Sequence, residues 1–175
     1  VALHGQSLGA AAIAYARTSA APHDAPGEIL RLRTVFSQLR SDEPFQRSCR
    51  SEVAAVMAML NVTEGDPELR ALLLAEEAAG TLTDTARCMV RRSLAQGDDD
   101  EASMRGLLDI VAELHPPQPY RELLVSAVVM WALNRGDTAL GDEAMAALDR
   151  PVRYVTGHIA SALVATHRQD LVEAR

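Results

Sequence analysis

Lysine is absent from this chain of 175 residues, and aromatic residues make up only 3% of it. A protein without lysine cannot form a Schiff base with a substrate or hold a nucleotide through the lysine of a phosphate-binding loop. The scarcity of aromatic and β-branched residues beside abundant alanine and leucine disfavours β-sheets and favours helices. All 17 basic residues are arginine. Arginine and alanine share GC-rich codons, so this composition is typical of a high-GC bacterial genome.

Long apolar runs and paired cysteine motifs are also missing. No apolar run reaches 18 residues, so we expect no transmembrane helix. The first residues do not show the basic segment and apolar stretch of a signal peptide. Cys49 and Cys88 lie outside any metal-binding spacing, which predicts buried, reduced thiols. We therefore expect a cytoplasmic protein with no metal and no cofactor.

The net charge of -7 argues against nonspecific nucleic-acid binding, which needs a basic surface. Two groups of arginines could otherwise bind phosphate, and we expect them to pair with nearby acids instead. These groups are Arg31 with Arg33, and Arg87 with Arg91 and Arg92. With 48% hydrophobic residues the chain is not disordered. We expect neither nucleic acid nor a membrane as its partner.

The chain does contain apolar stretches at helical spacing, separated by start and stop signals. Acids followed by proline predict helix starts at Pro44 and Pro67, and Gly80, Gly97 and Gly136 predict helix stops. The predicted helices cover 6–18, 28–38, 44–60, 67–79, 83–95, 101–114, 120–134, 138–148 and a last stretch after residue 151. Eight or nine short helices predict an all-α single domain, 1–175, of antiparallel hairpins in an irregular bundle or an α-solenoid-like array.

Two Pro-rich segments interrupt this pattern. Residues 20–27 predict a loop or short linker. The segment 115–119 has three prolines, which predict an extended path and a candidate sub-division of the domain. It is either a rigid connector or a docking strip for an aromatic groove. The acidic run 98–101 lacks the ligand spacing of a calcium loop, so we expect it to begin the next helix.

The last third of the chain carries Pro116-Pro117-x-Pro119-Tyr120, an apolar helix ending in Trp131, Arg135-Gly136-Asp137 and Pro151-x-x-Tyr154. In these features, over about residues 115–165, it resembles a family of uncharacterised actinobacterial proteins known as a domain of unknown function. The resemblance implies a cytoplasmic protein of high-GC origin without catalytic residues. Members of that family usually carry strands in an N-terminal part, and no strand pattern is found here.

We expect this protein to be a protein-interaction or self-association module without catalytic activity. The candidate interaction residues lie at the Pro-rich break and in the helix that follows it: His115, Tyr120, Arg121, Trp131 and Arg135. Trp131 shares a helical face with several aliphatic residues, which predicts a position in the core. A groove between this helix and the Pro-rich strip could accept a partner.

Two alternatives remain open. The motif Gly5-Gln6-Ser7-Leu8-Gly9 is similar to the nucleophile elbow of serine hydrolases, with Ser7 as nucleophile and Asp109 and His158 as triad partners. Without neighbouring strands, the motif equally predicts a helix start capped by Ser7. The other alternative is a helical bundle that binds a small molecule in a closed apolar cavity.

Overall fold

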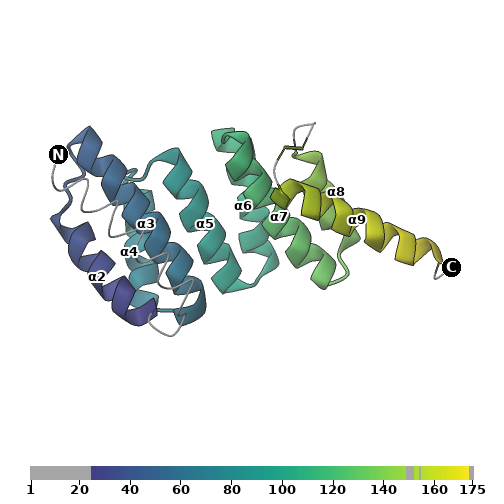
Figure 1. Cartoon of the computed structure of the whole chain (residues 1–175), viewed down its shortest axis with the longest axis horizontal. Helices are drawn as coiled ribbons and strands as arrows, with labels where there is room; N and C mark the ends of the chain where they lie inside the picture. Colours follow the sequence, from purple (N-terminus) through teal and green to yellow (C-terminus); the bar gives the residue numbers. More distant parts are fainter. Residues whose placement is uncertain (1–24, 149–151, 154, 174–175) are drawn as a thin grey trace. The chain divides into compact units, whose positions relative to one another are not determined.

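The computed structural model describes residues 25–148, 152–153 and 155–173 of the chain. Within these ranges the chain forms eight α-helices and no strand, which confirms the predicted all-α fold (Figure 1). The helices divide into two compact units, with the boundary between Gly97 and Asp98. The Pro-rich break at 115–119 lies inside the second unit, and a sub-division there stays a prediction. The predicted helix over 6–18 lies outside the described residues.

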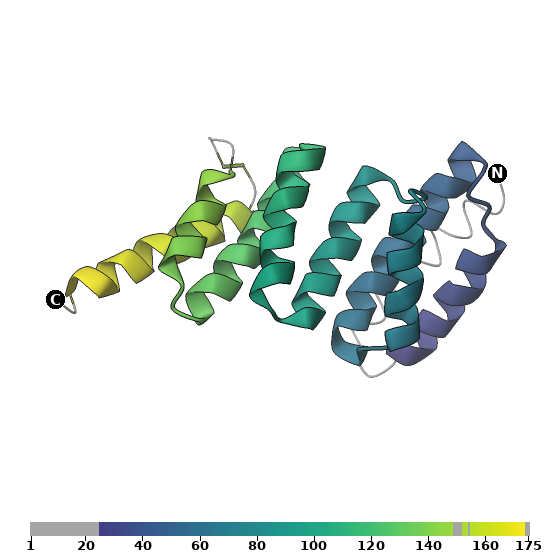
Figure 2. The same cartoon turned by 180° about the vertical axis from the view of Figure 1, so that it is seen from behind.

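Unit 1 is the part that ends at Gly97. Helix α3 packs against both α2 and α4, as Figure 1 and the reverse view in Figure 2 show. The fourth helix, α5, extends one residue past the boundary between the units. The bounds are α2 (Ala25–Gln38), α3 (Pro44–Glu64), α4 (Pro67–Ala78) and α5 (Asp84–Asp98).

Unit 2 begins at Asp98 and is built around α7. This helix packs against α6, α8 and α9, and its described buried side chains therefore lie on several faces of the helix. A helix that is apolar on several faces belongs at the centre of a bundle. The bounds are α6 (Glu101–Leu114), α7 (Gln118–Asn134), α8 (Thr138–Ala146) and α9 (Val155–Glu173).

Aspartate caps and left-handed glycines set several helix ends, and Gly80 and Gly136 are two of the three predicted stops. The side chain of Asp66 accepts hydrogen bonds from two backbone N–H groups in the first turn of α4, and that of Asp137 accepts one in α8. Gly65, Gly80 and Gly136 follow helices with φ of +65°, +65° and +74°, a conformation that favours glycine. Local sequence signals therefore decide where these helices begin and end.

Several helix ends differ from the prediction, and three of these differences have a clear local cause. Helix α2 begins at Ala25, so the last part of the predicted loop 20–27 is already helical. Gly97 does not stop α5; the left-handed turn comes at Asp99, with φ of 55°. Pro119 lies in the first turn of α7, where no N–H is needed, so it begins the helix rather than breaking it. The predicted extended path is thus limited to the residues before α7.

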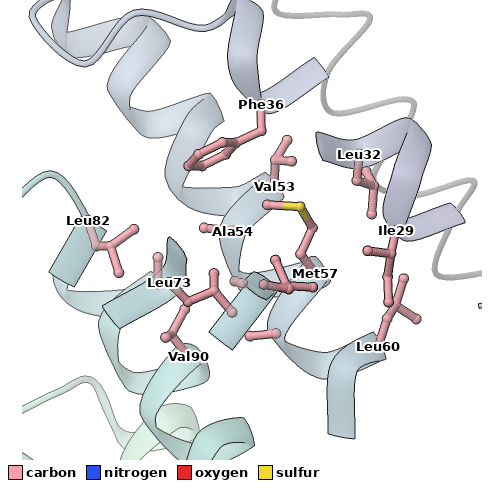
Figure 3. Packing of buried hydrophobic residues seen from close by; sticks show 14 of the residues in the cluster. Ile29, Leu32, Phe36, Val53, Ala54, Met57, Leu60, Leu73, Leu82 and Val90 are labelled. Carbon is pink, nitrogen blue, oxygen red and sulfur yellow. The ribbon is translucent and has the colours of Figure 1, made fainter. Parts of the chain in front are cut away.

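The core of unit 1 collects aliphatic side chains from its four helices around Phe36 (Figure 3). Leu32, Met57 and Leu73 are almost completely buried there. The apolar residues of α3 form a stripe at helical spacing, and Phe45 at its start is 49% exposed because it lies in the first turn of that helix. The rest of the stripe faces α2 and α4.

Arg50 joins three helices of unit 1. From α3, its Nη1 donates to the carbonyl oxygens of Phe36 (2.7 Å) and Leu39 (2.9 Å) at the end of α2. Its Nε donates to Glu76 in α4 (3.1 Å), and its guanidinium lies 3.7 Å from the centre of the Phe36 ring. Burial alone would raise the pKa of Glu76, but hydrogen bonds from Arg50 and Thr81 hold that pKa below its usual value.

Both cysteines are free and buried in unit 1, as predicted. Burial is the main cause that raises the pKa of the Cys88 thiol to about 11, so this thiol stays protonated at neutral pH. None of the helices in the described ranges combines the length and apolar character that a membrane span requires.

Candidate functional site

The five predicted interaction residues fall into two groups at opposite ends of α7. His115, Tyr120 and Arg121 lie near its N-terminal end, and Trp131 and Arg135 lie near its C-terminal end. A helix rises about 1.5 Å per residue, so Tyr120 and Arg135 are separated by roughly 22 Å along the axis. The structure therefore does not bring the five residues together into one site.

The N-terminal group forms the connection between α6 and α7. His115 ends α6 in a left-handed conformation with φ of 46°, and its side chain is exposed. Pro116 is buried next to it, and the carbonyl of Pro117 accepts the backbone N–H groups of Tyr120 (3.0 Å) and Arg121 (3.1 Å). These contacts are those of a rigid connector, whereas a docking role for the strip stays a prediction.

The C-terminal group is a cluster of three side chains: Asp99, Trp131 and Arg135. The indole N–H of Trp131 donates to one carboxylate oxygen of Asp99 (2.9 Å), and the guanidinium of Arg135 donates to the other (2.8 Å). The same guanidinium lies 4.2 Å from the centre of the Trp131 ring. Each of the three side chains thus contacts the other two.

This cluster lies at the surface. The side chains of Asp99 and Arg135 are 64% and 42% exposed. Hydrogen bonds from Arg135, and then from Trp131, hold the pKa of Asp99 below its usual value. Trp131 is only half-buried, so its predicted place in the core is wrong: the indole N–H is bound to a surface carboxylate.

Of the rest of the acidic run, Asp100 and Glu101 begin α6, as predicted, whereas Asp98 is the last residue of α5. Asp100 caps α6 by accepting the backbone N–H of Ser103 (2.8 Å), and Asp98 accepts the Ser103 hydroxyl (2.9 Å). In the described parts of the chain, no group of three or more histidine, cysteine, aspartate or glutamate side chains is arranged to hold a metal ion.

Helix α9 shows an unusual distribution of apolar side chains. It buries Gly157, Ala160 and Val164. Glycine and alanine are the two smallest amino acids. Among the side chains of α9 that the structure describes, the two largest aliphatic ones point outward, with Ile159 47% and Leu163 40% exposed. Positions four apart share one face of a helix, so these two form a continuous exposed apolar strip. An amphipathic helix packed on a core normally has the opposite arrangement.

The arginine groups pair with acids, as predicted, with one exception. Arg87 and Arg91 both contact Glu77, at 3.0 and 2.6 Å. Arg31 pairs with Glu28, and Arg33 pairs with Asp66 and Glu68. Arg92 differs, because its buried Nε has no hydrogen-bond partner among the described residues and burial lowers its pKa. Paired arginines leave little free positive charge for a phosphate.

A small-molecule site would need an enclosed apolar cavity. One hollow of about 280 Å³ in unit 1 is lined by Ile29, Leu30 and the ion pair of Arg33 with Asp66. Leu30 is 66% exposed at its edge, so the hollow opens to solvent. This geometry is that of a surface depression rather than the closed cavity that a buried ligand would occupy.

The serine-hydrolase alternative depends on residues that are only partly described. The motif around Ser7 lies outside the described residues. Asp109 in α6 and His158 in α9 are both exposed, and no hydrogen bond links these two described side chains. A triad requires its acid to orient the histidine. The hydrolase therefore stays a prediction without support from the described helices.

Sequence reasoning missed Glu122, a carboxylate in the second turn of α7 that is 0% exposed. Its Oε1 accepts from the Gln118 side chain and from the backbone N–H of Arg153, each at 2.9 Å. The only signal in the sequence is a single acid in the most apolar helix. That signal does not identify a buried contact, because the partner at Arg153 is 31 residues away along the chain.

Comparison with protein-family models, with curated proteins and with solved structures finds no match for this chain. The resemblance of about residues 115–165 to an uncharacterised actinobacterial family therefore stays a prediction.

Proposed function

We propose that this protein is a module for protein interaction or self-association without catalytic activity, and that it contacts its partner through α9. The observation that carries this proposal is the exposed strip of Ile159 and Leu163 on a helix that buries small residues instead. An apolar strip of this kind gains free energy when a second surface removes it from water.

The expected strength of the contact follows from the area that is still exposed. Complete burial of an aliphatic side chain is worth about 1.5–3 kcal/mol. Because roughly half of Ile159 and of Leu163 is exposed, covering both contributes about 2 kcal/mol, or roughly 30-fold in Kd. The strip can thus anchor an interface, while further contacts supply the remaining affinity.

The partner is a protein, either a second copy of this chain or a different one. The net charge of -7 disfavours nucleic acid. The cluster of Asp99, Trp131 and Arg135 offers a second exposed surface in the same unit, with donors and an acceptor that are already oriented. Tryptophan and arginine are the residues most enriched at the energetic centres of interfaces.

The test compares two double variants of the full chain by sedimentation velocity over a wide range of concentrations. The variant I159S/L163S removes the strip on α9. The matched control L30S/F45S removes from unit 1 two apolar side chains that are at least as exposed, Leu30 at 66% and Phe45 at 49%. We expect the wild type and the control to self-associate and the α9 variant to remain monomeric.

If the wild type is monomeric throughout, the same three proteins serve as bait in a bacterial lysate. A stoichiometric protein that the wild type and the control retain, and the α9 variant loses, supports the proposal. Equal behaviour of the two variants in both experiments contradicts it, because the strip on α9 would then make no contact.

A further inference from the structure

The first two thirds of α9 carry no formal charge. From residue 155 to residue 166 the helix contains no aspartate, glutamate, lysine or arginine, although the whole chain has a net charge of -7. Four exposed residues of this stretch are Ile159, Ala162, Leu163 and Thr166. A surface helix normally turns charged side chains toward solvent, whereas a helix that is neutral on both sides is normally covered on both. The outward side of α9 therefore has the character of a contact surface.

The four exposed residues have the spacing of a packing site for a second helix. Positions i, i+3, i+4 and i+7 form one hole on a helix surface, into which a large side chain of a facing helix inserts. Leu163 is 40% exposed and large enough to fill such a hole, while Ala162 beside it is small and leaves room for a side chain from the other helix. One helix thus supplies both the side chain and the hole, so a second copy of α9 is a complementary surface.

The charges at the two ends of α9 favour one direction of pairing. The exposed Arg153 lies two residues before the helix begins, and the helix ends at Glu173. In an antiparallel pair the beginning of one helix lies beside the end of the other, so these opposite charges approach each other. The two helix dipoles are then also opposed, which is the favourable arrangement. A parallel pair would instead place like ends together.

We infer that the partner at α9 is a second copy of this chain, and that the two α9 helices pack antiparallel across a two-fold axis between Ala162 and Leu163. In this register Ile159 of each copy faces Thr166 of the other. Two copies with a net charge of -7 repel each other, and a neutral surface is where that repulsion is smallest. The inference rests on the proposed function and names the partner of the same surface.

The test is disulfide trapping of full-length variants that carry one added cysteine, by mild oxidation and electrophoresis without reductant. Cys49 and Cys88 are buried and stay in every variant. Ala162→Cys places its thiol beside the two-fold axis. Because a disulfide needs Cα atoms within about 7 Å, we expect this variant to form a covalent dimer about tenfold faster than Ala112→Cys. The control Ala112→Cys is the same change at an exposed position of α6.

A second set of variants tests the direction of pairing. In the antiparallel register the two copies of residue 166 are seven positions apart, or roughly 10 Å along the axis, which is too far for a disulfide. We expect Thr166→Cys to link to itself no faster than the control. In an equal mixture of Ile159→Cys and Thr166→Cys, the two variants should link to each other, as read by mass spectrometry of the linked peptides.

The outcomes separate the inference from the proposed function. Fast linkage of Ala162→Cys, with Thr166→Cys linking to Ile159→Cys and not to itself, supports the antiparallel pair. Self-linkage of Thr166→Cys as fast as that of Ala162→Cys overturns it, because the helices would then be parallel. Linkage of Ala162→Cys no faster than that of the control overturns a second copy as the partner. The proposed function survives that last result only if I159S/L163S loses a different protein that the wild type retains from the lysate.

Discussion

The two units use opposite charges for the same purpose at a helix end. In unit 1 the guanidinium of Arg50 donates to carbonyl oxygens at the C-terminal end of α2. In unit 2 the carboxylate of Glu122 accepts the backbone N–H of Arg153 just before α9. Each side chain complements the partial charge of the helix end that it contacts. A charged side chain from a neighbouring helix thus orients α2 in one unit and α9 in the other.

The two arrangements differ in the exposure of the charged side chain and in the number of helices that it is shown to join. Arg50 has a counter-ion in Glu76 and an aromatic ring in Phe36, and its side chain is still 16% exposed. Glu122 is 0% exposed, and it accepts hydrogen bonds from the Gln118 side chain and from the backbone N–H of Arg153. The network in unit 1 joins three helices, so its loss should affect the whole unit. The contact in unit 2 should affect one helix.

The largest effect is expected for Arg50→Ala. This change leaves the Glu76 carboxylate, 13% exposed, without its cation and removes two donors from the end of α2. We expect a loss of about 3 kcal/mol in the free energy of unfolding, measured by urea denaturation and circular dichroism. The control Arg40→Ala removes an ion pair with Asp42 that is 63% exposed on both sides, and should leave the urea midpoint unchanged. Equal midpoints for the two variants would show that the buried network is not what holds unit 1 together.

A smaller loss of stability is expected when the N-cap of α4 in unit 1 or of α8 in unit 2 is removed. Asp66→Ala removes hydrogen bonds to two N–H groups of α4, and Asp137→Ala removes one to α8. Loss of an N-cap costs about 1 kcal/mol, so both variants should unfold at lower urea, with Asp66→Ala the more affected. Asp109→Ala, at an exposed position within α6, is the control. A midpoint for Asp66→Ala equal to that of the control would contradict a capping role.

The pH dependence of stability should distinguish Glu76, which belongs to the Arg50 network, from an exposed acid of the same unit. The pKa of Glu76 in the folded protein lies below its usual value of 4.5, so the unfolded chain binds its proton first as pH falls. The contribution of this group to stability is therefore complete above about pH 5 and is lost as pH falls through the folded pKa. We expect Glu76→Gln to flatten the decrease in unfolding free energy between neutral and acid pH. Glu52→Gln, at an exposed position of α3, should keep the slope of the wild type.

Much of the fold could be predicted because helix ends are encoded locally. Asp66 and Asp137 act on N–H groups within three residues, and Gly80 and Gly136 need only their own backbone conformation. The exposure of Phe45 could not be predicted, because a helical stripe shows which residues share a face but not how far along the helix the core extends.

The contacts that distinguish the two units could not be predicted, since they join residues far apart in the chain. Arg50 meets Glu76 across 26 positions, and Glu122 meets Arg153 across 31. Trp131 was expected in the core because nothing in its own helix shows that Asp99 lies beside it. Such pairings depend on how helices pack, and a single sequence carries no signal for them.

The smallest expected effect concerns the exposed cluster of Asp99, Trp131 and Arg135. Trp131 is the only tryptophan, so its fluorescence reports on this cluster alone. Hydrogen bonds from Arg135 and Trp131 lower the pKa of Asp99. We therefore expect the fluorescence emission of Trp131 to change only when the pH falls below 3.8, the usual pKa of an aspartate. Asparagine tolerates the left-handed backbone of residue 99, so the variant Asp99→Asn should keep the local fold. In this variant the pH-dependent change in emission should be absent.

The variant Arg135→Gln tests the same cluster by removing the hydrogen bond that Arg135 donates to Asp99. The hydrogen bond from Arg135 is the main cause of the lowered pKa of Asp99, and removing it should move the fluorescence transition to higher pH. The side chains are largely exposed, so the urea midpoint at neutral pH should stay close to that of the wild type. A transition at the same pH in both proteins would contradict the contact between Arg135 and Asp99. A large loss of stability would instead mean that this cluster holds α7 in place, as the buried Arg50 network holds α2.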